Sequence, residues 1–288
     1  MSKTMHRWTR LSSIKWEDAW QERLRFLSPS QLAFMSWPNS RALKIEAYCD
    51  EKTAKHLVKT FGGKVTRLTK EIITGDLDKP RAPLSVRGKL KVYSNKEDWT
   101  KWQEKGSRPP GIFVPAGMAF GTGEHATTAT CLRLLADTAK SLPENFIAAD
   151  FGTGSGILAI AAEVLGAGSV EAMDNDPACV RIAKENARTN GCRKLKVVRG
   201  SAPEWRPKKK CHLALANLYS DLLTITAPTI ASILIPPGIF IFSGVLRRQA
   251  EEVCQALEKA GFTKPSVISR GKWCAGICEL RTKSRAKK

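Results

Sequence analysis

A glycine-rich segment near the middle of the chain carries the clearest chemical signal. It reads Asp150-Phe-Gly152-Thr-Gly154-Ser-Gly156 and lies between an expected buried strand, residues 146–150, and an expected helix, residues 157–165. Glycines permit a sharp turn and the close approach of a ligand to the backbone. The spacing Gly-x-Gly-x-Gly differs from the Gly-x-Gly-x-x-Gly of dinucleotide sites, so a dehydrogenase is disfavoured. A pyrophosphate favours a helix N-terminus, whereas the cationic sulfonium of S-adenosylmethionine has no such need. We therefore expect Gly152 and Gly154 to contact a cofactor other than a dinucleotide.

Two further polar residues follow the next strands of the expected sheet. Asp174 comes twenty-two residues after Gly152, at the end of the strand 169–173, where a carboxylate can accept hydrogen bonds from both hydroxyls of a ribose. Asp176 precedes Pro177 and is expected to cap the helix 177–190. Ser201 follows the strand 195–199, and it either meets an adenine edge or belongs to a plain turn.

The strand 212–216 ends in Ala216-Asn217-Leu218-Tyr219. An asparagine at the carboxyl end of a strand in a parallel sheet faces the ligand crevice. Its amide can accept a hydrogen bond from an amine and donate one to a cofactor. The alternative for Asn217 is a cap on the following helix. We expect Asn217 to position an acceptor, with Tyr219 as a second catalytic candidate.

A segment rich in glycine and threonine, residues 117–128, precedes the first of these strands. We expect it to close over the ligand, with Phe120, Gly121 and Thr128 as cofactor contacts. Thr127 or Thr128 could also cap the helix 129–138. Glu124 and His125 are acid–base candidates, although a single histidine in a loop is more often only a hydrogen-bonding residue.

The elements that must position these residues fall into two groups. Regular alternation of strands and helices after residue 110 predicts a mostly parallel sheet with helices on both faces. Before it, residues 42–68 read as strand, helix and strand, and residues 16–27 as a helix with Trp16, Trp20, Leu24 and Leu27 on one face. Three prolines and three glycines in residues 105–117 suggest a linker. We predict a small α/β domain over residues 1–110, including the linker, and a larger domain over residues 111–288.

Composition limits the classes of function. The 288 residues are 42% apolar and 26% charged, which is typical of a globular protein, and the net charge of +20 suggests a polyanionic partner as readily as simple solubility. No apolar run is long enough to span a membrane, and no secretory signal is visible. The eight cysteines form no Cys-x-x-Cys pair, so we expect reduced thiols, no metal site and a cytoplasmic location.

Taken together, these segments resemble the ribosomal protein L11 methyltransferase family, PrmA type. The resemblance covers roughly residues 111–288 and rests on Met118–Thr128, Asp150–Ala162, Asp174–Pro177, Ala216–Tyr219 and Ser243–Leu246. It implies a Rossmann-like, seven-stranded class I methyltransferase domain preceded by a small α/β domain that captures the ribosomal protein. It also implies S-adenosylmethionine as cofactor, held by Thr128, Gly152, Asp174 and Asn217.

The implied reaction is displacement at the activated methyl by a neutral amine of a ribosomal protein of the L11 type. Deprotonation at pH 7 costs roughly 4.6 kcal/mol for a lysine but only about 1 kcal/mol for an α-amine, which is therefore the easier acceptor. Ribosomal RNA is a further expected contact, and we expect a monomer with no membrane partner. Two alternatives stay open: an RNA base-amine methyltransferase, and a ribosome-associated protein that binds the cofactor without turnover.

Overall fold

The computed structural model describes residues 5–27, 31–36, 41–68, 82–106, 109–115 and 125–282. The chain forms two compact units, Met1–Lys79 and Pro80–Lys288. The boundary expected from the sequence lay later, at residue 110. The difference arises because residues on both sides of position 110 share the core of the large sheet. These are Val86 and Leu90 before it and Ile112 after it.

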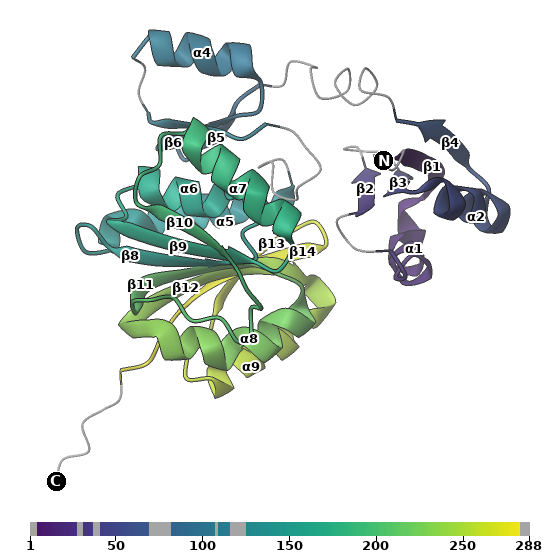
Figure 1. The fold of residues 1–288 in the computed structure, drawn as a ribbon. Coiled ribbons are helices and arrows are strands. Elements are labelled where there is room, and N and C mark those ends of the chain that lie inside the picture. Colours follow the sequence, from purple (N-terminus) through teal and green to yellow (C-terminus); the bar gives the residue numbers. More distant parts are fainter. Residues whose placement is uncertain are drawn as a thin grey trace. The chain divides into compact units, whose positions relative to one another are not determined.

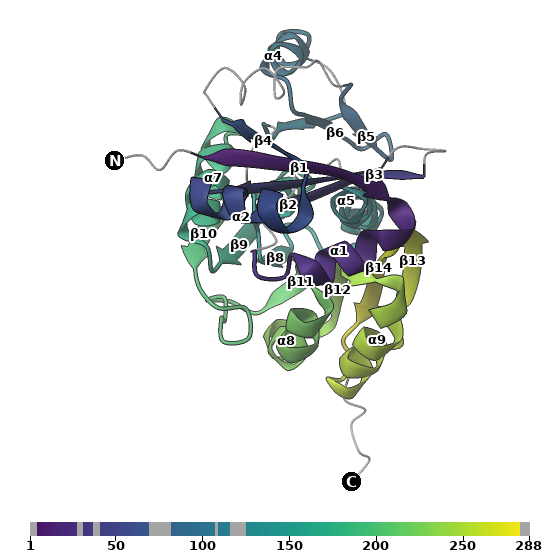
Figure 2. The same cartoon turned by 90° about the vertical axis from the view of Figure 1, so that its right-hand side faces the viewer.

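The first unit is built on a four-stranded sheet with the order β2-β3-β1-β4, and its described pairs are antiparallel. Side chains of both helices share one core with Trp8 of β1 and with alternate residues of β3, so α1 and α2 pack on the same face of the sheet (Figure 2). The elements are β1 (His6–Ser13), α1 (Glu17–Arg23), β2 (Leu32–Ser36), β3 (Ala42–Cys49), α2 (Glu51–Phe61) and β4 (Lys64–Arg67), with a short 3-10 turn at Ile14–Trp16.

The predicted strand–helix–strand piece is present as β3, α2 and β4, but these two strands do not pair with each other. Strand β1 lies between them, and the sequence analysis did not predict it. Trp8 is its only fully buried large side chain, and basic residues such as Arg7 and Arg10 flank it, so the segment resembles a polar tail. The predicted helix over residues 16–27 is shorter, and Trp16 is 53% exposed, whereas Trp20 is buried.

The second unit contains the predicted seven-stranded sheet, with the order β10-β9-β8-β11-β12-β14-β13. Helices α5, α6 and α7 cover one face, and α8 and α9 cover the other (Figure 1). The strands are β8 (Ile147–Phe151), β9 (Ser169–Asp174), β10 (Leu195–Arg199), β11 (Cys211–Asn217), β12 (Leu234–Leu246), β13 (Ser266–Arg270) and β14 (Trp273–Glu279). The helices are α5 (Ala126–Thr138), α6 (Ile157–Val164), α7 (Pro177–Thr189), α8 (Ser220–Ile233) and α9 (Ala250–Lys259), with 3-10 turns at Ala139–Ser141 and Arg247–Gln249.

Only β13 and β14 join this sheet through antiparallel pairs, whereas β8 to β12 are parallel. The strand order reverses between β8 and β11: β9 and β10 follow β8 on one side of the sheet, and β12 follows β11 on the other. Ligands of open parallel sheets bind at such a switch point, beyond the carboxyl ends of the strands. The fold therefore places the ends of β8, β9 and β11 where a ligand site is expected.

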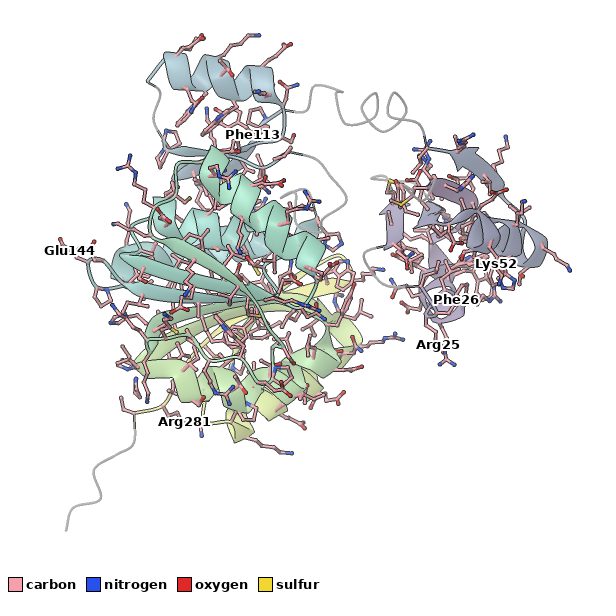
Figure 3. The ribbon with its side chains drawn as sticks, in the orientation of Figure 1. Arg25, Phe26, Lys52, Phe113, Glu144 and Arg281 are labelled. Atoms are coloured by element: carbon pink, nitrogen blue, oxygen red, sulfur yellow. The ribbon has the colours of Figure 1, made fainter. Side chains whose placement is uncertain are left out.

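A smaller, three-stranded sheet precedes this domain core. It consists of β5 (Leu84–Val86), β6 (Leu90–Tyr93) and β7 (Gly111–Phe113), with α4 (Lys96–Glu104) packed on it. Phe113 lies on the side facing α4, where its ring stacks at 6.2 Å on Trp99 (Figure 3). Strand β7 lies inside the stretch predicted as a linker. The side-chain amide of Asn190, at the end of α7, both donates to and accepts from the backbone of Phe113 at 2.7 Å, which ties this strand to the core.

Helix α8 follows Asn217, where the sequence analysis considered a helix but gave no bounds for it. Its sequence contains Pro228 and no charged residue after Asp221, so neither a helical pattern nor a polar face is obvious. Tertiary burial compensates, because Leu223, Ala227 and Ile230 are fully buried against the sheet. None of the described helices combines the length and the apolar character that crossing a membrane requires.

Candidate functional site

The glycine-rich turn after β8 has the backbone conformation that its sequence predicts. Gly152, Gly154 and Gly156 have φ values of +67°, +55° and +84°, a region that side chains disfavour. The N–H of Thr153 donates to the carbonyl of Met173 at 2.9 Å, which fastens the turn to the end of β9. Helix α6 begins directly after Gly156. The turn is thus held open toward the carboxyl edge of the sheet.

Asp174 ends β9 beside this turn, as predicted. The side chain is 8% exposed, and its two oxygens accept from different backbone N–H groups, that of Gly154 at 2.9 Å and that of Asp176 at 3.0 Å. A carboxylate has about four acceptor positions, so roughly two remain for a ligand. Asp176 accepts from the N–H of Ala178 at 2.8 Å and caps α7, which confirms the role predicted for it.

Asp150 is a second carboxyl group close to the turn, and the sequence analysis gave it no role of its own. The residue is 1% exposed, and one oxygen accepts from the Thr153 hydroxyl at 2.6 Å. Burial raises the pKa of Asp150 to about 7, the Thr153 hydrogen bond opposes that rise, and the charge of Asp174 adds to it. The floor of the site therefore contains a carboxyl group that is partly protonated near neutral pH.

Asn217 ends β11 on the other side of the switch point. Its side-chain nitrogen donates to the hydroxyls of Thr127 and Thr128, each at 3.2 Å. Its side-chain oxygen is buried and has no hydrogen-bond partner among the described residues. Helix α8 is preceded by Tyr219, so Asn217 is not a helix cap. Among the described residues, the amide oxygen therefore remains a buried acceptor that is open to a further donor.

Leu218 is held between two glycines. A Cβ atom on Gly152 would overlap the Leu218 side chain, and one on Gly244 would overlap its backbone. The Leu218 N–H also donates to the carbonyl of Ser243 at 3.1 Å. The motif Ser243-Gly244 contributed to the resemblance, but its role in fixing the Asn217 segment was not foreseen, because it depends on a contact between β12 and the end of β11.

The structure makes His125 the cap of α5, rather than Thr127 or Thr128. Its ring lies edge-on to Trp273 at 5.2 Å, and its Nδ1 is 2.7 Å from the Thr127 hydroxyl. Burial, together with the smaller effect of the nearby charge of Lys272, lowers the pKa of His125 to about 4. The histidine is therefore neutral near pH 7 and acts as a hydrogen-bonding residue.

Two predicted site residues, Ser201 and Tyr219, make no side-chain hydrogen bond to the other site residues that the structure describes. Ser201 is exposed, and its backbone carbonyl accepts from the N–H groups of Glu204 and Trp205 at 3.0 and 2.8 Å, which is the geometry of a turn. Tyr219 follows Leu218 and is 52% exposed. Phe120, Gly121 and Glu124 lie outside the described residues. Within the described part of the chain, no group of three His, Cys, Asp or Glu side chains could hold a metal ion.

The chain matches the model of the family described as "Ribosomal protein L11 methyltransferase (PrmA)" over residues 82–281. The chain belongs to this family. The matched range includes the turn after β8, Asp174 and Asn217, and it begins near the start of the second compact unit. The predicted membership and fold class are confirmed.

Two curated relatives and one solved structure support this assignment. Ribosomal protein L11 methyltransferases of Pelotomaculum thermopropionicum and Heliobacterium modesticaldum are 42% and 38% identical over 171 and 164 residues, or 59% and 57% of this chain. The matched regions cover 54% and 51% of those proteins, so the chain spans about half the length of the curated relatives. The crystal structure of a ribosomal protein L11 methylase from Lactobacillus delbrueckii subsp. bulgaricus superposes with a TM-score of 0.59 and 28% identity, covering 70% of this chain and all of that one.

The arrangement suits an adenosyl cofactor of the kind used by class I methyltransferases. Asp174 retains acceptor positions toward the crevice, the backbone at Gly152 and Gly154 lies close by, and Asn217 has an unpartnered oxygen among the described residues. None of these groups needs a metal to complete it. The residues present therefore fit the cofactor that the family implies.

Proposed function

We propose that this protein is a methyltransferase that transfers the methyl group of S-adenosylmethionine to an amino group of ribosomal protein L11 or a similar protein. The observation that carries the proposal is the buried side-chain oxygen of Asn217, which has no partner among the described residues. It lies at the switch point of a class I methyltransferase sheet. A neutral amide oxygen can accept a hydrogen bond from an amine and favours its protonated form less than a carboxylate would.

In this proposal, Asp174 binds the ribose hydroxyls of the cofactor, and Gly152, Gly154 and Thr128 also contact the cofactor. Ser201, Phe120 and Gly121 complete the proposed contacts. The cofactor supplies an activated methyl group when bound, and the protein binds, aligns and desolvates the reactants. Asn217 orients the acceptor nitrogen. Tyr219, two residues later, is the second candidate for contact with the acceptor.

The acceptor amine must be neutral before it can react. At pH 7 this costs about 1 kcal/mol for an α-amine and roughly 4.6 kcal/mol for a lysine. The groups next to Asn217 are hydroxyls, and the nearby His125 has its pKa lowered to about 4 and is neutral. We therefore expect the α-amine of the protein substrate to react faster, with lysines as slower acceptors.

Transfer of labelled methyl groups tests the proposal. Wild-type protein and Asp174→Ala are incubated with labelled S-adenosylmethionine and either intact ribosomal protein L11 or L11 with an acetylated α-amine. We expect label on intact L11, a slower reaction on the acetylated protein, and roughly 100-fold less label with Asp174→Ala at limiting cofactor. Binding of the cofactor without label on any protein or RNA would instead support the non-catalytic alternative.

A second candidate is transfer to a base amine of RNA. The observation in its favour is Tyr219, whose half-exposed side chain follows Asn217 by two residues. An exposed aromatic ring beside an amide can stack on a planar base while the amide binds its exocyclic nitrogen. Ribosomal RNA without protein, used as a further acceptor in the same assay, decides between them. Label on RNA alone would favour this candidate.

We also propose that ribosomal RNA contacts the edge strand β10. Residues 188–210 contain nine lysines and arginines and one acidic residue, Glu204. The neighbouring carboxylates of Glu163 and Glu171 accept from backbone N–H groups of this segment. All nine cations are exposed, and none forms an ion pair with a described residue. We call six of them the basic edge: Arg193, Lys194, Lys196, Lys208, Lys209 and Lys210.

The salt dependence of RNA binding tests the basic edge. Each phosphate contact contributes roughly 0.7–0.9 to the slope of log affinity against log salt. Replacing Lys208, Lys209 and Lys210 by Gln should lower that slope by about 2. The matched control replaces three lysines of α2, Lys52, Lys55 and Lys59. Equal slopes in the two triple variants would contradict the proposed contact.

The proposal further describes a cytoplasmic monomer. All eight cysteines are free in the structure, in keeping with a reducing compartment. Sedimentation at several protein concentrations tests the oligomeric state, and a mass that rises with concentration would contradict a monomer.

A further inference from the structure

A chain of three hydrogen-bonding side chains leads into the site. Starting from the cap of α5, the Nδ1 of His125 lies 2.7 Å from the Thr127 hydroxyl, and that hydroxyl lies 3.2 Å from the side-chain nitrogen of Asn217. Thr127 is 1% exposed, and this series of side chains ends at the Asn217 oxygen, which has no partner among the described residues. The order of these groups determines which of them can donate.

His125 sets the direction of the chain. As the helix cap, its Nδ1 accepts the backbone N–H of Thr127, at 3.4 Å, and therefore carries no proton. The Thr127 hydroxyl must then donate its single proton to Nδ1. Having used that proton, the same hydroxyl can only accept from Asn217. The nitrogen of the Asn217 amide consequently faces the threonines, and its oxygen faces away from them.

The reverse arrangement would follow if Nδ1 carried a proton. Nδ1 would then donate to the Thr127 hydroxyl, whose own proton would become available to Asn217. The amide would be more stable with its oxygen toward Thr127, and its NH₂ group would face the crevice. An NH₂ group repels the N–H bonds of an approaching amine, whereas an oxygen accepts from them.

We propose that His125 is a positioning residue that, through Thr127, keeps the side-chain oxygen of Asn217 directed at the acceptor amine. This inference rests on the proposed amine acceptor and assigns a role to the histidine that involves no proton transfer. His125 lies against Trp273, and the charged group next to it among the described residues is Lys272. Burial and this cation both favour the neutral ring that the chain requires.

Variants of two buried threonines on α5 test the chain. Thr127→Val keeps the shape of the side chain but removes the hydroxyl, and Thr127→Ser restores the hydroxyl. The matched control is Thr130→Val, because Thr130 is also buried and its hydroxyl donates only to the carbonyl of Ala126, at 2.7 Å. We expect Thr127→Val to lower kcat about tenfold with cofactor Kd nearly unchanged. Thr127→Ser should recover most of the rate, and Thr130→Val should retain it. Equal kcat values for Thr127→Val and Thr130→Val would overturn the proposal.

The tautomer of His125 provides a readout that does not depend on turnover. In protein labelled with nitrogen-15, we expect the Nδ1 resonance of His125 to be that of an unprotonated ring nitrogen between pH 6 and 8. A proton on Nδ1 in this range would overturn the proposal. Wild-type protein that methylates no acceptor would contradict the proposed function, and the tautomer would still decide the direction of the hydrogen bonds.

Discussion

Strands β9 and β11 both end at the centre of the large sheet, but their polar side chains are held in different ways. Within the described part of the chain, Asp174 on β9 accepts from backbone N–H groups alone, whereas Asn217 on β11 donates to side-chain hydroxyls alone. Backbone donors are fixed by the turn itself, and hydroxyls can rotate. One side of the site is therefore rigid, as binding a constant cofactor requires. The other side depends on the protonation of a neighbour, which suits the positioning of a reacting amine.

The glycines around Leu218 provide the strongest way to break this arrangement. Gly244→Ala places a Cβ atom against the Leu218 backbone, at a residue whose φ is +87°. We expect a loss of about 3–4 kcal/mol in the free energy of unfolding, from left-handed strain and overpacking together. Gly152→Ala should cost less, because the overlapping Leu218 side chain can rotate. Denaturant unfolding measures both.

A matched control for these two variants is Gly191→Ala. Gly191 has a φ of +68° and nothing within 4 Å of an added Cβ, so only the backbone strain applies. We expect a cost of about 1–2 kcal/mol. A cost equal to that of Gly244→Ala would show that strain, rather than the clamp on Leu218, determines the stability.

Removing the carboxylate on the rigid side should abolish most cofactor affinity. Asp174→Ala loses two charge-assisted hydrogen bonds to the ligand, worth about 3 kcal/mol together, or a rise in Kd of roughly 100-fold. Titration calorimetry with S-adenosylmethionine measures this change. A Kd within threefold of wild type would show that the ribose is held elsewhere.

The buried Asp150 should make stability depend on pH. Its pKa of about 7 in the folded protein lies above the ordinary value of 3.8, so between these values the folded state binds more protons than the unfolded chain. Its stabilising contribution is complete below about pH 4 and is lost as pH rises to 7. We expect wild type to lose about 2 kcal/mol from this group between pH 5 and 7, relative to Asp150→Asn. Parallel pH profiles of the two proteins would refute the raised pKa.

The smallest expected effect distinguishes Asp176, which follows β9, from Asp174, which ends it. Asp176→Ala removes only the cap of α7 and should cost about 1 kcal/mol of stability. Cofactor Kd should stay unchanged, because no hydrogen bond of Asp174 depends on the Asp176 side chain. A large rise in Kd would mean that the cap also positions the ligand site.

The sequence predicted the parts of the site that depend on strand ends. In a parallel sheet, residues that follow adjacent strands meet at one edge, so Asp174, Asn217 and the turn at Gly152 were found from spacing and residue type. The direction of the Asn217 amide was not predictable, because it depends on a hydrogen bond to Thr127, which lies ninety positions earlier in the chain. Likewise, β1 was missed because its pairing partners β3 and β4 lie far along the chain, and its own alternation is mostly polar.

The clamp on Leu218 has a consequence for how the proposed acceptor specificity could change. Gly244 packs against the backbone of Leu218 and Gly152 against its side chain, so we expect Asn217 and the glycine-rich turn to keep their places when the side chain at position 219 is changed. Tyr219 is 52% exposed. Selection, or a directed library, can therefore vary acceptor preference at this position without disturbing methyl-donor binding, which makes Tyr219 the natural starting point for diversification within this fold.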